Sequence, residues 1–458
     1  MKRFFETLQN IWKIEELRNR ILFTIGMLFV FRIGSFIVLP GVNPTVLEQA
    51  TQSNTNDLLG LINLFTGGAF NNAAIFALGI MPYITASIIV QLLGFAVPYF
   101  QKLQQKEGES GRKKLTQITR LLTVAITLVQ GGGYLTWINS QGAVSPELPA
   151  GVFWFSNIII LSAGTVFAMW LGERITERGV GNGVSLLITI GIIAVLPQSL
   201  VAEFQLQLAS NGLLLFVLEL AVLFFVVLVT VAIVQAVRRI PIQFAKRMVG
   251  RGSNELPAAS ARDYIPLKLN ASGVMPIIFA QALMFLPATV AQFFAGGDGQ
   301  VDITATNSFL GALIDPFSTP YNIIYFVLVV LFTYVYTALI VNPQQYAEYL
   351  KRQNAFIPGI KPGKSTADFI DATTTRITLP GSIMLGLIAI LPAIIAAFGV
   401  NQAFAMFFGG TSLLILVAVV LDTLQQIESY LLMRRYDGLV KSGRVQGRSR
   451  MQGIGAGM

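Results

Sequence analysis

The side chains that usually carry enzymatic chemistry are scarce in this chain. Its 458 residues contain no histidine and no cysteine. That removes the commonest general base, the commonest zinc ligand, any thiolate nucleophile and any disulfide. The glycine-containing runs Gly108–Lys114 and Gly179–Gly183 lack the spacing of a phosphate-binding loop. The sequence therefore predicts no catalytic residue, no metal site and no cofactor, and it argues against an enzyme.

A few polar residues lie inside long apolar runs and remain as candidates for function. Arg32 and Glu219 are ionisable; we interpret Arg32 as a structural or snorkelling residue and expect Glu219 to face the outer interface. Ser87 and Gln91 share one helical face with Ile84, at i, i+3 and i+7 spacing. Because polar groups at membrane depth avoid lipid, we expect Ser87 and Gln91 to face protein or water.

Ten apolar runs must position these side chains. The chain is 54% hydrophobic and 12% charged, whereas soluble domains carry about 25% charged residues. Each run has the length that a membrane-spanning helix needs. The run Leu58–Phe70 is too short to span and ends in two glycines, which predicts a re-entrant half-helix. The ten runs are Ile21–Leu39, Ala73–Phe95, Leu121–Ile138, Val152–Leu171, Val184–Leu200, Leu213–Val237, Val274–Phe294, Ile323–Val341, Leu379–Phe398 and Phe404–Leu424.

The basic residues lie on one side of these runs. Of the 32 Lys and Arg, all except Arg32 fall in the two termini or in loops that follow even-numbered runs. The positive-inside rule then places both termini in the cytoplasm. The loops 238–271 and 343–378 are longer than orientation requires, which favours a docking surface for a cytosolic partner. The alternative is that their charges only orient the helices and contact anionic lipid.

Two short motifs recur along the chain at an offset of five runs. Gly79–Ala86 and Gly273–Ala280 are identical at five of eight positions, and Gly183–Ile188 and Gly410–Ile415 at five of six. An odd-numbered repeat inserts upside down relative to its copy, so the pattern predicts two inverted five-helix halves, 21–211 and 212–430. Four isoleucines that share a place in both copies would face the pseudo-twofold axis: Ile84, Ile188, Ile278 and Ile415.

The character of these axis residues separates two classes of function. A secondary transporter lines its midplane with ionisable or hydrogen-bonding groups. An aliphatic constriction instead suits a gate that closes by packing and dewetting around something that must pass without sticking. The sequence therefore favours a passive channel, with an inverted-repeat transporter for a small solute as the alternative.

The chain resembles the SecY family, the channel subunits of the general protein translocon, over nearly its whole length. Long, colinear segments carry the resemblance: Phe31–Phe36 with Pro40-Gly41, Leu64–Ala69, Ile75–Ile89, Lys106–Arg112, Met169–Gly183, Pro266–Asn270, Pro358–Gly363 and Phe408–Ile415. The resemblance implies an all-α polytopic fold in which ten transmembrane helices form a clamshell around a central pore. It also implies that the protein moves unfolded polypeptides across a bacterial inner membrane and releases membrane segments sideways into lipid.

The resemblance assigns roles to particular residues. It implies a plug at about 56–71, and within it we single out Leu61, Leu64, Phe65, Gly67 and Gly68. It implies a lateral gate between helices 2/3 and 7/8, where Ser87 and Gln91 either hold two helices together or hold the gate shut until a signal helix enters. It carries the pore ring over to Ile80, Ile84, Val184, Ile188, Ile278 and Ile415.

The resemblance also implies partners, namely the membrane subunits SecE and SecG, the motor SecA, the ribosome, client chains with signal sequences and the lipid bilayer. Residues 1–20 would form a cytoplasmic amphipathic segment and 431–458 a cytoplasmic tail. The expected docking residues are Lys246, Arg247, Arg251 and Lys361. Lys361 stands where the family usually has Arg, and 252–260 departs from the family's usual hairpin. These departures affect the detail of docking and not its location.

Overall fold

Ten long helices correspond in order to the ten apolar runs. The computed structural model describes residues 12, 14–47, 58–105, 108–145, 149–209, 212–244, 262–294 and 315–441. The long helices are α2 (Glu15–Gly34), α5 (Met81–Ala96), α7 (Gly108–Ser140), α8 (Ala150–Arg178), α9 (Gly183–Ala209), α10 (Leu213–Gln235), α11 (Met275–Phe294), α13 (Thr319–Ile340), α15 (Lys364–Ala397) and α17 (Gly410–Lys441). Within the described ranges, four short helices lie between them: α4 (Leu58–Thr66), α6 (Pro98–Gln105), α14 (Pro343–Arg352) and α16 (Gln402–Ala405).

The described helices have the length and composition of membrane spans. Seven helical stretches within the described ranges are long and apolar enough to cross a bilayer. Two shorter apolar helices, in α5 and α11, fall below that length. The remaining long helix, α2, begins with Glu15 and Glu16 and becomes apolar only after Arg20. A multi-pass helical protein follows from these helices.

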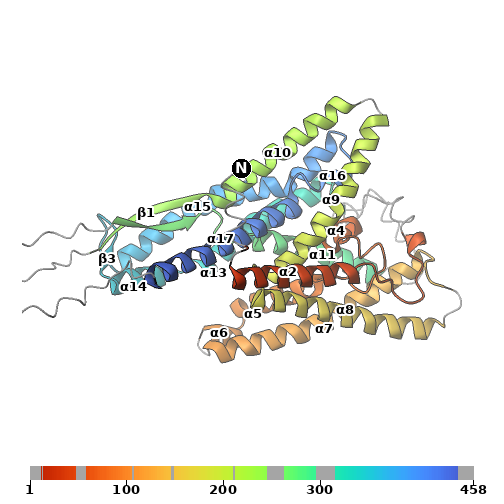
Figure 1. Cartoon of the computed structure of the whole chain (residues 1–458), viewed down its shortest axis with the longest axis horizontal. Helices are drawn as coiled ribbons and strands as arrows, with labels where there is room; N and C mark the ends of the chain where they lie inside the picture. The colour runs from red at the N-terminus through yellow and green to blue at the C-terminus, as the bar shows by residue number, and fades with distance from the viewer. Residues whose placement is uncertain are drawn as a thin grey trace, which may run out of the picture.

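The helices form two groups that meet along two seams. α2, α4, α5, α7, α8 and α9 contact one another, and α10, α11, α13, α15, α16 and α17 form the second group. One seam lies where α9 contacts α10, α16 and α17, and the other where α11 contacts α5 and α7. The long helices run roughly along one common direction (Figure 1). Two groups joined along two seams are the arrangement from which a clamshell is built.

The repeated motifs adopt the same local structure in both groups. Gly79 and Gly273 both have positive φ, and a helix begins two residues later, at Met81 and Met275. Proline follows at the next position in each copy, where its fixed φ suits a first helical turn. The equivalent motifs at Gly183 and Gly410 both open a helix, α9 and α17. The sequence repeat is therefore also a repeat of helix starts.

Two predicted helix starts were wrong for the same physical reason. The run from Ala73 was expected to be helical throughout, but residues 73–80 form turns and α5 begins only at Met81. The run from Phe404 is divided into α16 and α17, with Gly410 at a φ of 63° between them. Gly79, just before α5, also has a positive φ. A residue with a side chain adopts such a φ only at a steric cost, so these two glycines mark breaks in the helix that hydropathy does not reveal.

A small antiparallel sheet interrupts the helices, and the sequence analysis did not anticipate it. β1 (Val237–Phe244) pairs with β2 (Arg262–Lys268) in a register that places Ile240 opposite Ile265. β1 also pairs with β3 (Ala355–Phe356), so the two long basic loops form one structural unit. Buried side chains of the sheet, α14 and α15 form its core: Ile240, Ile242, Leu267, Leu350, Ala355, Ile357 and Ile370.

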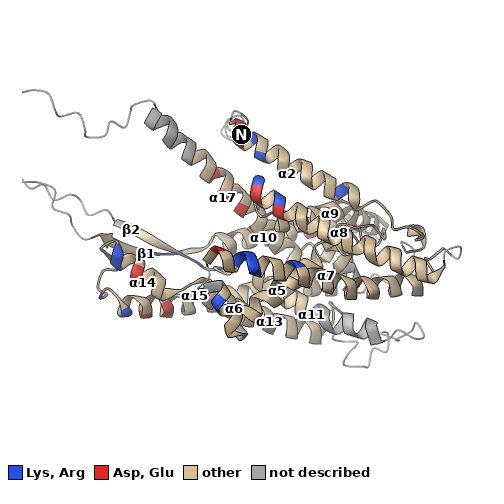
Figure 2. Cartoon of the chain, turned by 90° about the horizontal axis from the view of Figure 1, so that it is seen from below, with Lys and Arg blue, Asp and Glu red and all other residues tan. Residues whose placement is uncertain are grey.

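The charges are distributed unevenly along the long axis of the molecule. In Figure 2, most blue and red segments of the cartoon lie toward the end that carries β1, β2 and α14 or on the neighbouring ends of helices. The loop at 141–145, at the opposite end, contains no charged residue. The one-sided charge that the sequence predicts is thus one-sided in space as well.

Candidate functional site

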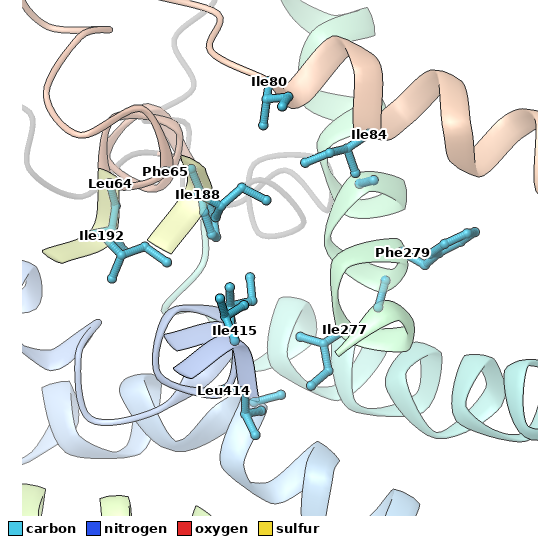
Figure 3. Packing of buried hydrophobic residues seen from close by; sticks show 14 of the residues in the cluster. Leu64, Phe65, Ile80, Ile84, Ile188, Ile192, Ile277, Phe279, Leu414 and Ile415 are labelled. Carbon is cyan, nitrogen blue, oxygen red and sulfur yellow. The ribbon is translucent and has the colours of Figure 1, made fainter. Parts of the chain in front are cut away.

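The structure brings the six expected ring residues into one aliphatic cluster. Ile80, Ile84, Ile188 and Ile415 are buried members of the largest cluster of buried apolar residues, and Val184 and Ile278 pack against it. These side chains come from both groups of helices: α5 and the residue before it, α9, α11 and α17. Figure 3 shows Ile84, Ile188 and Ile415 converging from three directions.

The short helix before α5 fills one side of this cluster. Leu64 and Phe65 of α4 are buried members of it, 5% and 7% exposed. Figure 3 places both beside Ile188 and Ile192. α4 packs against α9, the helix that supplies Val184 and Ile188. Helix α4 therefore packs against the cluster that contains the six expected ring residues; the side chain of Leu61 lies outside the described residues.

A close backbone approach fixes the end of α4. Gly67 and Gly68 follow α4 with φ of 66° and 90°, so the chain reverses through a conformation that favours glycine. A Cβ on Gly67 would lie 2.8 Å from the Cα of Gly191 in α9. A Cβ on Gly191 would in turn overlap the carbonyl oxygen of Phe65. The pair Gly67 and Gly191 allows α4 to sit directly on the backbone of α9.

Arg32 binds the backbone that follows α4, a contact that the sequence did not indicate. Its Nη1 donates a hydrogen bond to the carbonyl oxygen of Gly67, and its guanidinium carbon lies 4.6 Å from the ring centre of Phe36. The charge is thus satisfied inside the protein instead of by snorkelling to an interface. The expected structural role is retained, and the partner is a backbone carbonyl just after α4.

Two further contacts anchor the segment that follows α4. Tyr134 of α7 donates a 2.6 Å hydrogen bond to the carbonyl oxygen of Phe70. The aromatic rings of Phe70 and Tyr134 lie 4.6 Å apart. The backbone N–H of Ile75 donates to the carbonyl oxygen of Ile37, so the segment between α4 and α5 is tied to the residues that follow α2. These contacts hold the segment that leads out of α4.

The two expected gate residues lie at the seam between α5 and the second group of helices. Gln91 Nε2 donates to Ser87 Oγ within α5, at 3.1 Å. Gln91 Oε1 accepts a 3.1 Å hydrogen bond from the hydroxyl of Tyr336 in α13. Tyr336 packs edge-on against Phe279 of α11, with ring centres 4.6 Å apart. Ser87 and Gln91 do face protein, and Tyr336 is the partner that sequence reasoning missed.

The expected docking residues are only partly described. Lys361 is exposed in the turn between β3 and α15, and its carbonyl oxygen accepts a 2.9 Å hydrogen bond from Thr366 Oγ1. Gly359 and Gly363 on either side have positive φ, which fixes this turn. Lys246, Arg247 and Arg251 lie outside the described residues.

Glu219 does not face the outer interface as expected. It is 6% exposed, and its Oε1 accepts a 3.2 Å hydrogen bond from Gln207 of α9. Glu203, fully buried on the same helix, accepts a second bond from Gln207. The sequence analysis missed Glu203 and Gln207 because it ended this span at Leu200, whereas α9 continues to Ala209. Pro197 lies within the helix without ending it.

Comparison with known proteins assigns the family. The SecY family model matches residues 74–424. The protein translocase subunit SecY of Streptomyces coelicolor is 43% identical over 441 residues, covering 94% of this chain and 98% of its own length. The SecY subunit of Mycobacterium bovis is 42% identical and covers 93% and 97%. The chain belongs to the SecY family. The resemblance found in the sequence is thereby confirmed, and so are the non-enzymatic function and the role as a protein-translocation channel subunit.

Solved structures agree with this SecY-family fold. A protein-conducting channel superposes with a TM-score of 0.62, at 17% identity, over 94% of this chain and 95% of its own. Sec61 in a canine ribosome–channel complex gives a TM-score of 0.60 at 16% identity, over 94% and 95%. At these identities the likeness concerns the fold, and it confirms the expected ten-helix channel architecture. The transporter alternative finds no support.

Proposed function

We propose that the cluster around Ile188 is the closed seal of this channel, and that α4 is its plug. The observation that carries the proposal is that six aliphatic side chains, from both groups of helices, belong to or pack against one buried cluster that also contains Leu64 and Phe65. These side chains offer no hydrogen bond to a passing polypeptide. They are bulky enough to pack around an extended chain and exclude water, as an apolar constriction does.

The seam between α5 and α11 is the proposed lateral exit. α11 contacts both α5 and α7 there, and the bond between Gln91 and Tyr336 crosses from one group of helices to the other. A signal helix entering lipid at this seam must separate those two side chains. The seam on the opposite side, where α9 meets α10, α16 and α17, is then the hinge.

The membrane and the partners are proposed from the family. We place the chain in a bacterial inner membrane with both termini cytoplasmic, on the basis of the one-sided charge. The sheet β1–β3 and the turn at Lys361 would then form the cytoplasmic docking surface for SecA and the ribosome. Sec61 and the yeast Ssh1 complex were both solved with ribosomes bound. SecE and SecG would complete the complex.

The cysteine-free chain allows a direct test of the proposed pore. A single cysteine at Ile188 should form a disulfide with a cysteine in a client polypeptide that is stalled during translocation. A cysteine at Ile193, on the same helix but 43% exposed, is the matched control and should not crosslink. Equal crosslinking at both positions, or crosslinking at Ile193 alone, would refute the proposed path.

A further inference from the structure

Two buried carboxyl groups face each other across the proposed hinge. Glu203 of α9 is 0% exposed and Glu219 of α10 is 6% exposed. The side-chain amide of Gln207 donates to Oε1 of both, at 2.8 Å to Glu203 and 3.2 Å to Glu219. The backbone N–H of Asn401 donates to Oε2 of Glu203 at 3.0 Å. The cluster joins α9 of the first group of helices to α10 and the start of α16 in the second.

One oxygen of this cluster has no donor. Oε2 of Glu219 is buried without a hydrogen-bond partner. Oε1 of Glu219 and Oε1 of Glu203 both accept from the same nitrogen, Nε2 of Gln207, so the two carboxyl groups lie side by side. Two ionised carboxylates at that separation would repel each other in a site with little water to screen them. A buried charge of this kind is normally paired or bound to a cation.

The helices that carry and surround the two glutamates supply no positively charged partner for such a carboxylate. Helices α9, α10 and α16, and the residues 398–409 around α16, contain no Lys or Arg, and their only ionisable side chains are these two glutamates. The other helices that contact α9 or α10 do carry charged residues, but among the described side chains none forms an ion pair with Glu203 or Glu219. These charges are Glu15, Glu16, Arg18, Arg20 and Arg32 of α2, Glu173, Arg174, Glu177 and Arg178 of α8, Lys364, Asp368, Asp371 and Arg376 of α15, and Asp422, Glu428, Arg434, Arg435, Asp437 and Lys441 of α17.

We propose that Glu203 and Glu219 share one proton, and that this proton-binding site holds α9 against α10 and α16 at the hinge. Glu203 already accepts from two N–H groups, so it is the carboxylate. Glu219 is the neutral acid, and its Oε2 hydroxyl donates to Glu203. That single proton satisfies the orphaned oxygen and removes the repulsion at the same time.

The position of the site determines which pH it responds to. The end of α9 and the start of α10 lie at the end of the molecule away from β1 and β3 (Figure 1). In the proposed orientation this is the extracytoplasmic side, which is exposed to the external pH. Loss of the proton at high pH would leave two like charges facing each other across the seam, so the contact of α9 with α10 and α16 should weaken as the pH rises.

Matched amide substitutions test the assignment of the proton. In E219Q the new NH2 group still donates to Glu203 and the amide oxygen still accepts from Gln207, so the folded protein should be retained. In E203Q the side-chain NH2 must point toward either Gln207 or the N–H of Asn401. Both of these groups are donors, so one hydrogen bond is lost. E428Q, an exposed carboxyl on α17, is the control.

The experiment uses the full-length chain in lipid nanodiscs. Infrared spectra of the wild type should contain the carbonyl band of a protonated carboxyl, shifted in D2O, and E219Q should lose it while E428Q retains it. The thermal midpoint of the wild type should fall by several degrees from neutral to alkaline pH, and that fall should be absent in E219Q. E203Q should melt lower at every pH.

Three results would overturn the proposal. The first is a protonated-carboxyl band that persists in E219Q. The second is an identical pH dependence of the thermal midpoint in wild type and E219Q. The third is a stabilisation of the wild type, but not of E219Q, by added Ca²⁺ or Na⁺, which would show that a metal cation occupies the site in place of a proton. None of these measurements depends on translocation activity, so they test the proton site independently of the pore assignment.

Discussion

The hydroxyl of Tyr336 on α13 donates a 3.1 Å hydrogen bond to Oε1 of Gln91 on α5, across the seam where the two groups of helices meet. Gln91 is oriented by its second bond, to Ser87, and Tyr336 by the ring of Phe279. Hydrogen bonds between membrane helices contribute about 0.6 kcal/mol on average. Such a bond changes the equilibrium constant for opening the proposed gate by roughly threefold. It therefore adjusts the opening equilibrium without locking the gate.

Removing this bond should change how hydrophobic a signal must be to open the gate. Tyr336→Phe deletes only the hydroxyl and keeps the ring packed on Phe279, so we expect weaker signals to be accepted. Gln91→Leu also removes the bond and should change the threshold. The measurement is translocation of a reporter with a graded series of signal sequences. Tyr349→Phe, exposed on α14, is the control, and an unchanged threshold in Tyr336→Phe would leave the bond a purely structural role.

The order and number of long helices could be predicted from the sequence because hydropathy and charge vary on the scale of a span. The orientation of Ser87 and Gln91 toward protein followed from the cost of exposing polar groups to lipid. Tyr336 could not be predicted as their partner, since it lies 245 residues from Gln91 in a run that reads as uniformly apolar. Pairing across that distance is decided by tertiary packing.

The candidate site, like the fold, could be predicted from the sequence only in part. The internal repeat indicated Ile84, Ile188, Ile278 and Ile415, because the same packing problem recurs in each half. The contact between Arg32 and Gly67 was not indicated, since the acceptor is a backbone carbonyl and leaves no trace in residue type. The sheet was missed because its strands lie in loops whose basic content was interpreted as charge alone.

Arg32 should hold the plug in its closed position. Its bond to the carbonyl of Gly67 is charge-assisted, and such bonds contribute about 1.5–3 kcal/mol. Arg32→Met keeps an apolar stem but leaves that carbonyl without its donor, so we expect a larger ion conductance of the resting channel in planar bilayers. Arg376→Met, exposed on α15, should leave the conductance unchanged. A resting channel that stays closed in Arg32→Met would show that Gly191 and Tyr134 hold the plug without it.

Lys361 should contribute to docking and not to folding. Its side chain is exposed and only its carbonyl is bonded, so Lys361→Glu should alter stability by no more than about 0.5 kcal/mol. A reversed charge should weaken the salt-dependent encounter with an anionic partner surface. We expect SecA-driven transport to fail while the protein still inserts. Lys113→Glu, an exposed reversal on α7, is the control; normal transport by Lys361→Glu would exclude this turn.

The proposed orientation can be tested with cysteines, because the chain has none of its own. We expect Pro40–Asn72, Ser140–Gly151 and Gly296–Pro320 to be extracytoplasmic; most of the last range lies outside the described residues. Ser140→Cys, exposed at the end of α7, should react with an impermeant thiol reagent added outside cells. Asp371→Cys on α15 should react only after the membrane is opened. The reverse pattern of labelling would invert the topology.

The seal should depend on the ring as a group more than on any single member. Losing one methyl group from a buried isoleucine costs about 0.5–1.5 kcal/mol, and neighbouring side chains repack. Replacing Ile84, Ile188, Ile278 and Ile415 together with Ser or Asn should instead hydrate the constriction and remove its dewetting barrier. We expect this quadruple variant to pass ions in planar bilayers and to need a signal sequence less strictly.

A quadruple variant with Leu at the same four positions separates polarity from disturbed packing. Leucine keeps the ring apolar at nearly the same volume, so this variant should remain ion-tight and selective. If the Ser or Asn variant folds and is equally tight, the barrier does not lie in these isoleucines. The contacts of Leu64 and Phe65 with α9 would then have to exclude ions on their own, and the Arg32→Met variant would be expected to leak more than the quadruple variant does.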